Sequence, residues 1–301
     1  MISGITVIYK EAGFTSHDVV AKMRGICGQK KIGHTGTLDP MATGVLPVCL
    51  GSATKLCDML ADRDKEYAAE LLLGVETDTQ DATGQVLAER PVEVTETQIR
   101  RAAAFFVGDY DQIPPMYSAL KVNGRKLYEL ARARKEVERK ARPVVIKELE
   151  ILECAIPVVR FRVVCSKGTY IRTLCADIGE KLGCGGTMRK LERTRVGGFC
   201  LESARTLGEM QQLKDENRLQ GAVLPVDSVF TDCPVLHVQG DYCRLVDNGN
   251  AFLADQTQEQ EIYAPGRWIR VYRPDESFVG IYAWEPERER YKPVKMFLEN
   301  D

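Results

Sequence analysis

A short stretch near the start of the chain constrains the backbone more than any other. Residues 33–47 read GHTGTLDPMATGVLP, with three glycines, two prolines, one histidine and one aspartate. Glycine permits positive φ and close backbone approach, whereas proline fixes φ and removes a hydrogen-bond donor. We therefore predict a rigid, irregular loop that holds Asp39 in a defined position. Outside such a setting, a loop aspartate is usually a turn residue or a helix cap.

Length and charge set limits on what the chain can do. At 301 residues it is long enough for two domains. Its formal net charge of −2 gives no general attraction to a polyanion, so nucleic-acid binding would need a local basic surface. Residues 121–142 provide one, with nine basic residues against three acidic ones, an excess of six. The alternative for such a run is a solvated helix face.

Cysteine usage and the first residues bear on location. The ten cysteines form no C-x-x-C pair, which favours reduced thiols over a zinc site or a disulfide framework. The opening Met1–Gly4 lacks the basic start of a signal peptide, and no apolar run is long enough to span a membrane. We expect a cytoplasmic protein that does not bind membranes.

Hydrophobic periodicity predicts alternating strands and helices. Residues 5–9 are expected to form a short buried strand. A helix should follow that Ser16 caps and that Gly25 and Gly28 end. Further predicted elements are strands over residues 67–73, 144–152 and 158–165, a helix with a Thr95–Gln98 capping box, and a helix over residues 173–182.

The pattern of predicted elements changes from about Cys233. Short strand patterns over residues 268–272, 278–283 and 294–298 are separated by Gly, Pro, Asp and Asn. This spacing is typical of a small β domain. The sequence therefore predicts two domains, residues 1–230 and residues 231–301.

Four further segments accompany the Asp39 loop in a fixed order. They are Lys65-Glu66-Tyr67, the Thr- and Asp-rich residues 74–84, PPMYSALK at 114–121, and SKGTYIRT at 166–173. Together with the loop and its continuation to Lys55, they resemble the TruB family of tRNA pseudouridine synthases over most of residues 1–230. The resemblance implies an α+β pseudouridine synthase fold, a long mixed and mainly antiparallel sheet flanked by helices. It also implies that a small C-terminal β-barrel similar to the RNA-binding PUA type follows.

The same resemblance implies an activity. The family converts uridine 55 in the T-loop of tRNA to pseudouridine, flips the target base out of the RNA, and uses no cofactor and no metal. It implies a monomer that binds the tRNA T-stem-loop and has no obligatory protein partner. An additional role as a tRNA-folding chaperone is compatible with it.

Three catalytic residues are carried over by matching motifs. Asp39 is expected to be the nucleophile, because a carboxylate can attack and later leave; attack on ribose C1′ and attack on uracil C6 both remain open. Arg172 is expected to pair with Asp39 and to lower its pKa through the opposite charge. Tyr67 is expected to stack on the target base, although an aromatic residue starting a strand is otherwise a core residue.

Four residues are expected to bind substrate. His34 matches a histidine that helps to hold the target nucleotide out of the RNA, and Leu191 matches an apolar residue of the family pocket. Lys10 and Lys121 are expected to contact RNA phosphates, together with the basic residues 121–142. At Arg134 and Lys135, where relatives often carry glycine, we predict tighter phosphate contact.

Three other functions are compatible with parts of the sequence. The Thr35-Gly36-Thr37 run is similar to the loop of haloacid-dehalogenase-like phosphotransferases, but in that class the nucleophile precedes the run and magnesium is required. Asp78 and Asp81, which could ligate magnesium, are better explained as turn residues. A non-catalytic RNA chaperone of the same fold is disfavoured by the intact set of Asp39, Tyr67 and Arg172. A catalytic subunit of a guide-RNA-dependent particle is disfavoured because basic extensions are missing.

Overall fold

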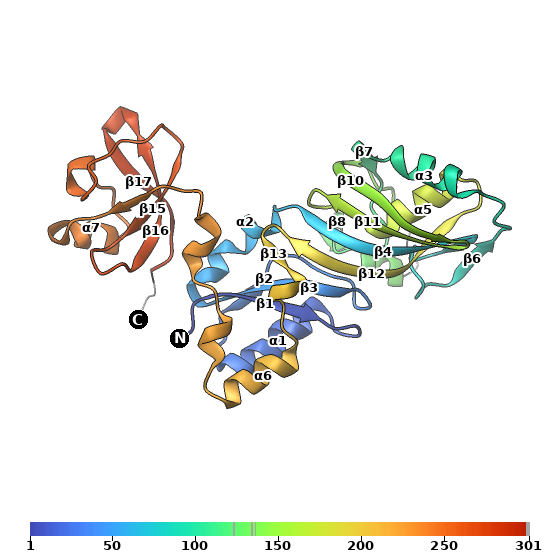
Figure 1. Ribbon diagram of the computed structural model, residues 1–301, viewed down its shortest axis with the longest axis horizontal. Coiled ribbons are helices and arrows are strands. Elements are labelled where there is room, and N and C mark those ends of the chain that lie inside the picture. Colours follow the sequence, from blue (N-terminus) through green and yellow to red (C-terminus); the bar gives the residue numbers. More distant parts are fainter. Residues whose placement is uncertain (123, 134, 136, 299–301) are drawn as a thin grey trace.

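A large mixed sheet runs through the molecule and a smaller sheet lies at one end of it (Figure 1). The computed structural model describes residues 1–298 except 123, 134 and 136, and within these residues the large sheet has nine strands and the smaller one four. The large sheet has the order β1-β3-β12-β4-β11-β10-β7, with β2 beside β3 and β13 beside β12.

The strands of the large sheet are β1 (Gly4–Lys10), β2 (Ile32–His34), β3 (Thr43–Leu50), β4 (Lys65–Leu73), β7 (Gly108–Gln112), β10 (Arg142–Ala155), β11 (Val158–Cys165), β12 (Gly186–Val196) and β13 (Phe199–Cys200). Two hairpins stand apart: β5 (Val75–Thr77) with β6 (Val86–Glu89), and β8 (Lys121–Val122) with β9 (Arg125–Lys126). The smaller sheet holds β14 (Val235–His237), β15 (Trp268–Tyr272), β16 (Phe278–Glu285) and β17 (Arg290–Met296).

The α-helices are α1 (Ser16–Cys27), α2 (Cys57–Ala61), α3 (Glu96–Ala104), α4 (Leu127–Arg132), α5 (Ile171–Lys181), α6 (Leu207–Asp215) and α7 (Cys243–Asp247). Short 3-10 helices cover Gly51–Leu56, Leu201–Ser203, Leu219–Ala222, Val226–Phe230, Gly240–Tyr242, Ala254–Gln256 and Pro286–Arg288. Helices α1 and α6 cover the β1–β3 half of the large sheet, and α3 and α5 cover the half that contains β10 and β11 (Figure 1).

The two halves of the large sheet meet where β3 pairs with β12. This pairing is parallel and short, with Glu192 opposite Thr43 and Arg193 opposite Gly44. The other described pairings in this sheet are antiparallel. The predicted α+β class, with a long, mainly antiparallel sheet flanked by helices, is confirmed.

The start of α1 differs from the prediction. Thr15, not Ser16, is the N-cap, and it forms a capping box with Asp18. Ser16 is buried instead, and its hydroxyl accepts a hydrogen bond from the Leu38 amide at 2.9 Å. Gly25 lies inside α1, so the predicted end there is wrong; the helix ends at Gly28, whose φ of 65° is left-handed.

Two other predicted elements hold with small changes. The capping box of Thr95 and Gln98 at the start of α3 is confirmed. Helix α5 begins at Ile171, two residues before the predicted start, because the chain leaves β11 through residues 166–170 and turns directly into the helix. Arg172 therefore lies in the first turn of α5.

The smaller sheet confirms that the chain after Cys233 is rich in short β-strands, as predicted. It has a core of its own around Leu236, Val271 and Tyr291. Its Ile281 also packs in one cluster with Ile5 of β1, so the two sheets share buried apolar contacts. Among the described residues its strands form an open order, β14-β15-β16-β17, and the PUA-type barrel stays a prediction. None of the helices built by the described residues has the length and apolar character needed to cross a bilayer.

Candidate active site

The Asp39 loop connects β2 to β3 and is held from several sides. Gly44 has a φ of +104°, and a Cβ there would stand 2.2 Å from the carbonyl oxygen of Arg193, so only glycine lets β3 meet β12. The Ala42 amide donates to the Asp39 carbonyl at 3.1 Å, which closes a turn. With the bond from Leu38 to Ser16, these contacts make the predicted rigid loop.

Asp39 and Arg172 form a two-point ion pair. The Arg172 Nε lies 2.9 Å from Asp39 Oδ2, and Nη2 donates to Oδ1 at 3.2 Å. The Arg172 side chain is 6% exposed, whereas that of Asp39 is 36% exposed. The arrangement fixes the carboxylate in direction and leaves part of it open.

Arg172 is itself held by the segments around it. Its Nη2 donates to the Tyr117 carbonyl at 2.9 Å and its Nη1 to the Thr79 carbonyl at 3.2 Å. Asp81 adds a second carboxylate, 3.5 Å from Nη1. Asp81 also accepts from the Thr83 amide, so the turn role expected for it is present together with a place at the site.

The pKa of Asp39 departs from the expectation. Burial raises it above the ordinary value, Arg172 lowers it, and Asp81 raises it further. The guanidinium thus acts in the predicted direction, but the low dielectric around a mostly covered carboxylate is the larger effect. The net pKa of Asp39 is raised, where the sequence predicted it to be lowered.

A cleft of about 960 Å³ opens beside Asp39. It is lined by residues of the Asp39 loop, of β4 and of β12, with Leu191 of β12 on its wall. Met41 also lines it and exposes 58% of its surface, which is unusual for a methionine. The lining is mixed: apolar side chains such as Met41, Phe161 and Leu191 stand beside several charged ones, and Asp39 and Asp81 are two of its carboxylates. A cleft with apolar surface and a few polar groups is typical of a small-molecule or nucleotide site.

Tyr67 lies on β4 and packs with Leu38 and Ala42. It is 8% exposed, and burial raises its pKa to about 12. Arg193 is its cross-strand partner on β12, and the guanidinium charge opposes this rise in pKa. The structure therefore brings Tyr67 to the inner side of the Asp39 loop, with little of its ring open.

His34 ends β2 and points its Nδ1 at its own loop. Nδ1 accepts from the Gly36 amide at 3.2 Å, which places the proton of the neutral ring on Nε2. Burial lowers the pKa of His34 and favours this neutral form. The His17 ring, which carried no signal in the sequence, stands edge-on to it with centroids 5.4 Å apart.

Lys10 does not lie where the prediction placed it. Its side chain is fully buried, and Nζ donates to the carbonyls of Phe14, Pro40 and Glu11 at 2.6, 2.9 and 3.1 Å. An ammonium closed in by three carbonyls cannot contact a phosphate. Burial lowers its pKa to about 8. Lys10 braces the backbone next to Asp39 instead.

Lys121 is exposed on the β8–β9 hairpin and does not line the cleft. The hairpin leads into α4, and both belong to the basic residues 121–142. Arg134 and Glu136 of that run lie outside the described residues, as does the predicted phosphate contact of Arg134. Lys121 is open to solvent, as a phosphate contact must be.

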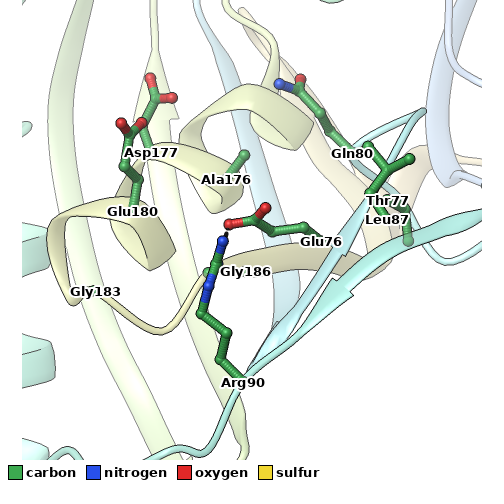
Figure 2. A pocket seen from close by; sticks show the side chains of 11 residues that line it. Glu76, Thr77, Gln80, Leu87, Arg90, Ala176, Asp177, Glu180, Gly183 and Gly186 are labelled. Atoms are coloured by element: carbon green, nitrogen blue, oxygen red, sulfur yellow. Dashed lines mark hydrogen bonds and ion pairs between the residues drawn. The ribbon is translucent and has the colours of Figure 1, made fainter.

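A second cavity of about 560 Å³ lies between β5, β6 and the end of α5 (Figure 2). Figure 2 shows the ion pair of Glu76 and Arg90 at its centre, with Asp177 and Glu180 on the α5 side. None of the predicted site residues lines it. Segment 74–84 thus lines both cavities. Thr77 and Gln80 line the second cavity, and Asp81 lines the cleft beside Asp39.

Comparison with known proteins identifies this arrangement. The family model for the N-terminal domain of TruB family pseudouridylate synthases matches residues 24–171, and that for the tRNA pseudouridylate synthase B C-terminal domain matches residues 172–231. The chain belongs to the TruB family. It is therefore an RNA-modifying isomerase, and the phosphotransferase alternative is wrong.

Members of the TruB family match over nearly the full chain. The tRNA pseudouridine synthase B of Lachnoclostridium phytofermentans is 50% identical, with 99% of this chain and 100% of that protein covered. That of Alkaliphilus oremlandii is 46% identical, with 98% and 97% covered.

Solved structures agree with the fold. An H/ACA RNP bound to a substrate RNA containing 2'-deoxyuridine matches with a TM-score of 0.72 and 25% identity, over 99% of this chain and 86% of that chain. The archaeal box H/ACA sRNP Nop10-Cbf5 complex matches with a TM-score of 0.71 and 26% identity, over 99% and 87%.

The sequence did not predict a place at this TruB family site for Arg193, Asp81 or His17. The sequence presents Arg193 only as one of the basic residues near Leu191, but its side chain is 1% exposed and contacts the Asp39 loop. Asp81 looked like a turn residue, and His17 like an ordinary helix residue. Alternation along β12 was the one available signal for Arg193, because it is spaced by two from Leu191 on the same strand.

Proposed function

We propose that the protein converts uridine to pseudouridine at position 55 in the T-loop of tRNA. The observation that carries the proposal is the ion pair of Asp39 and Arg172, which opens onto a cleft large enough for a nucleotide. The two relatives named tRNA pseudouridine synthase B support tRNA as the substrate. Their higher identity, compared with the H/ACA chains, favours a stand-alone enzyme over a subunit of such a particle. We propose that this enzyme acts as a monomer.

The proposed reaction gains and loses no atoms. The bond between uracil N1 and ribose C1′ breaks, a bond between uracil C5 and C1′ forms, and one proton leaves C5 while N1 gains one. Asp39 attacks C1′ or C6 through one oxygen of its partly exposed carboxylate and later leaves. Arg172 directs that oxygen toward the cleft, and a preorganised charge of this kind costs no rearrangement during the reaction.

The target base has to leave the RNA stack before it can reach Asp39. Extrusion costs a few kcal/mol, which contacts in the pocket must offset. Leu191 and Met41 provide apolar surface in the cleft, and Tyr67 is proposed to meet the base from the loop's inner side. His34, neutral at physiological pH, is proposed to hold the displaced nucleotide through its Nε2–H.

RNA is proposed to reach the cleft over a basic surface and a second domain. Lys121 and its neighbours in residues 121–142 are proposed to contact phosphates of the T-stem. We further propose that residues 1–230 form the catalytic domain and that residues 231–301 form an RNA-binding domain of PUA type. Catalysis is proposed to need neither a metal nor a cofactor.

The test compares the intact protein with Asp39→Asn and with the control Asp215→Asn, whose side chain is exposed at the end of α6 and does not line the cleft. Each is mixed with unmodified tRNA transcript in buffer with a chelator, and pseudouridine is mapped by position. Activity at position 55 is expected for the intact protein and the control, and none for Asp39→Asn.

Three outcomes would overturn the proposal. Pseudouridine at another position would reject the target uridine, and equal activity of Asp39→Asn would reject the nucleophile. If the intact protein binds and refolds the transcript without modifying it, the chaperone function replaces the enzymatic one.

A further inference from the structure

Arg193 is a buried cation with an unusual set of partners. It is 1% exposed and is the largest of the fully buried side chains. Its Nε donates to the Val45 carbonyl at 2.7 Å and its Nη2 to the Gly36 carbonyl at 3.3 Å. In the part of the chain that the structure describes, no carboxylate lies within ion-pair distance of it.

A buried charge without an opposite charge is costly, so its presence needs a reason. The burial itself lowers the pKa of Arg193, yet a guanidinium stays protonated in proteins. A methionine of similar length would fill the same space without the cost. The position therefore uses the charge or the planar donors of arginine, and not its volume alone.

The two carbonyls that Arg193 binds lie on opposite sides of Asp39. Gly36 precedes Asp39 by three residues and Val45 follows it by six, so one guanidinium holds both ends of the loop. Neutral carbonyls leave its charge uncompensated. The charge is therefore free to act on other groups that face it.

Tyr67 is the group directly opposite. Arg193 on β12 is the cross-strand partner of Tyr67 on β4, so their side chains stand next to each other on the same face of the sheet. The charge of Arg193 also lowers the pKa of His34, Lys10 and Lys65. Burial raises the pKa of Tyr67, and Arg193 opposes that rise.

We propose that Arg193 is a positioning residue that fixes the Tyr67 hydroxyl relative to the Asp39 loop through one guanidinium shared by both. This rests on the proposed roles of Asp39 and Tyr67. Arg193 is covered on all sides and does not touch the substrate. It acts on catalysis through the orientation and acidity of Tyr67, and a small misplacement of such a group lowers rates by about 10²-fold.

Three variants of the full-length protein test the kinetic part. Arg193→Met is expected to lower the single-turnover rate about 10²-fold, with the Kd for tRNA changed less than about threefold. Arg193→Lys keeps the positive charge but not the planar guanidinium. Its rate should therefore lie between the rates of the intact protein and of Arg193→Met. The control Arg195→Met, two residues along β12 and partly exposed, should leave the rate unchanged.

A second measurement separates positioning from mere structural support. 3-Fluorotyrosine is placed at position 67, and its ionisation is followed by 19F NMR in the intact protein and in the Arg193 variants. The pKa at position 67 should be higher in Arg193→Met than in Arg193→Lys or the intact protein. This readout does not depend on activity, so it stands even if the proposed function fails.

A double-mutant cycle closes the test. If Arg193 acts through Tyr67, the rate loss of Arg193→Met combined with Tyr67→Phe is smaller than the product of the two single losses. Fully multiplicative losses, or an unchanged pKa at position 67 in a folded Arg193→Met protein, would overturn the proposal. If Arg193→Met does not fold, Arg193→Lys carries the same comparison.

Discussion

Gly44 and Arg193 face each other where β3 and β12 pair in parallel, and their backbones are too close for any side chain on Gly44. A Cβ there would lie 2.2 Å from the Arg193 carbonyl oxygen and 2.8 Å from its amide nitrogen. The same contact joins the two halves of the large sheet and places Arg193 behind the Asp39 loop. Sheet architecture and site geometry therefore depend on one glycine.

Gly44→Ala is expected to destabilise the protein by about 3 kcal/mol or more, because it adds a steric clash with backbone to an unfavourable φ. Gly13→Ala is the matched control, since Gly13 also has a positive φ, +88°, but nothing within 4 Å of its Cβ position. It should cost about 1–2 kcal/mol. Urea unfolding followed by circular dichroism measures the free energy of unfolding of both variants. Equal losses of stability would show that the close approach of β3 to β12 at Gly44 carries no extra cost for a side chain.

Arg172→Ala is expected to slow single-turnover pseudouridine formation by about 10²-fold or more, because breaking a buried ion pair costs about 3–5 kcal/mol and each 1.36 kcal/mol is a factor of ten. The carbonyls of Thr79 and Tyr117 would also lose their donor. Arg101→Ala, exposed on α3, serves as control. A rate within a few-fold of the intact protein would show that Asp39 needs no partner.

The rate should fall in acid with an inflection above pH 3.8, the ordinary value for aspartate, because the pKa of Asp39 is raised. Only the ionised carboxylate is a nucleophile, so protonation removes activity. Asp81→Asn removes one charge that raises this pKa and should move the inflection to lower pH. Single-turnover rates at constant ionic strength measure it, and a shift to higher pH would contradict the assignment.

Stability is linked to the same proton. The folded protein holds the Asp39 proton at a higher pH than the unfolded chain does, so this group makes stability fall as pH rises from 3.8 through the raised pKa. His34 has the opposite slope: because its folded pKa is lowered, its contribution is lost as pH falls from 6.5 through that pKa. Thermal unfolding of Asp39→Asn and His34→Asn, measured across pH, separates the contributions of these two groups to stability.

Lys10 and Lys121 should respond differently in RNA binding. Lys121→Met is expected to reduce the slope of log K for tRNA against log salt by about one, because it removes one phosphate contact. Lys10→Met should leave that slope unchanged and lower stability instead, since its ammonium is bound to three carbonyls. Filter binding over a salt series gives the slopes, and a reduced slope for Lys10→Met would restore it as an RNA contact.

The sequence predicted the fold class and the pairing of Asp39 with Arg172, because both are implied by motifs that resemble those of the TruB family; spacing alone would not have shown them. It failed where the outcome depends on burial. Lys10 and Arg193 are cations that a sequence places at the surface, and only the packed structure shows that carbonyls close over them. The raised pKa of Asp39 was missed for the same reason, since desolvation is a property of the assembled cleft.

The pairing of β3 with β12, the β3–β12 seam, also determines when the active site can form during synthesis of the chain. Asp39 and Arg172 are separated by 133 residues, and Arg193 reaches Val45 across 148. Contacts between such distant residues form late in folding, after the cost of closing a long loop has been met. A nascent chain that has completed β3 thus has no complete active site until β12 has left the ribosome. The seam makes catalytic competence one of the last properties that the growing polypeptide acquires.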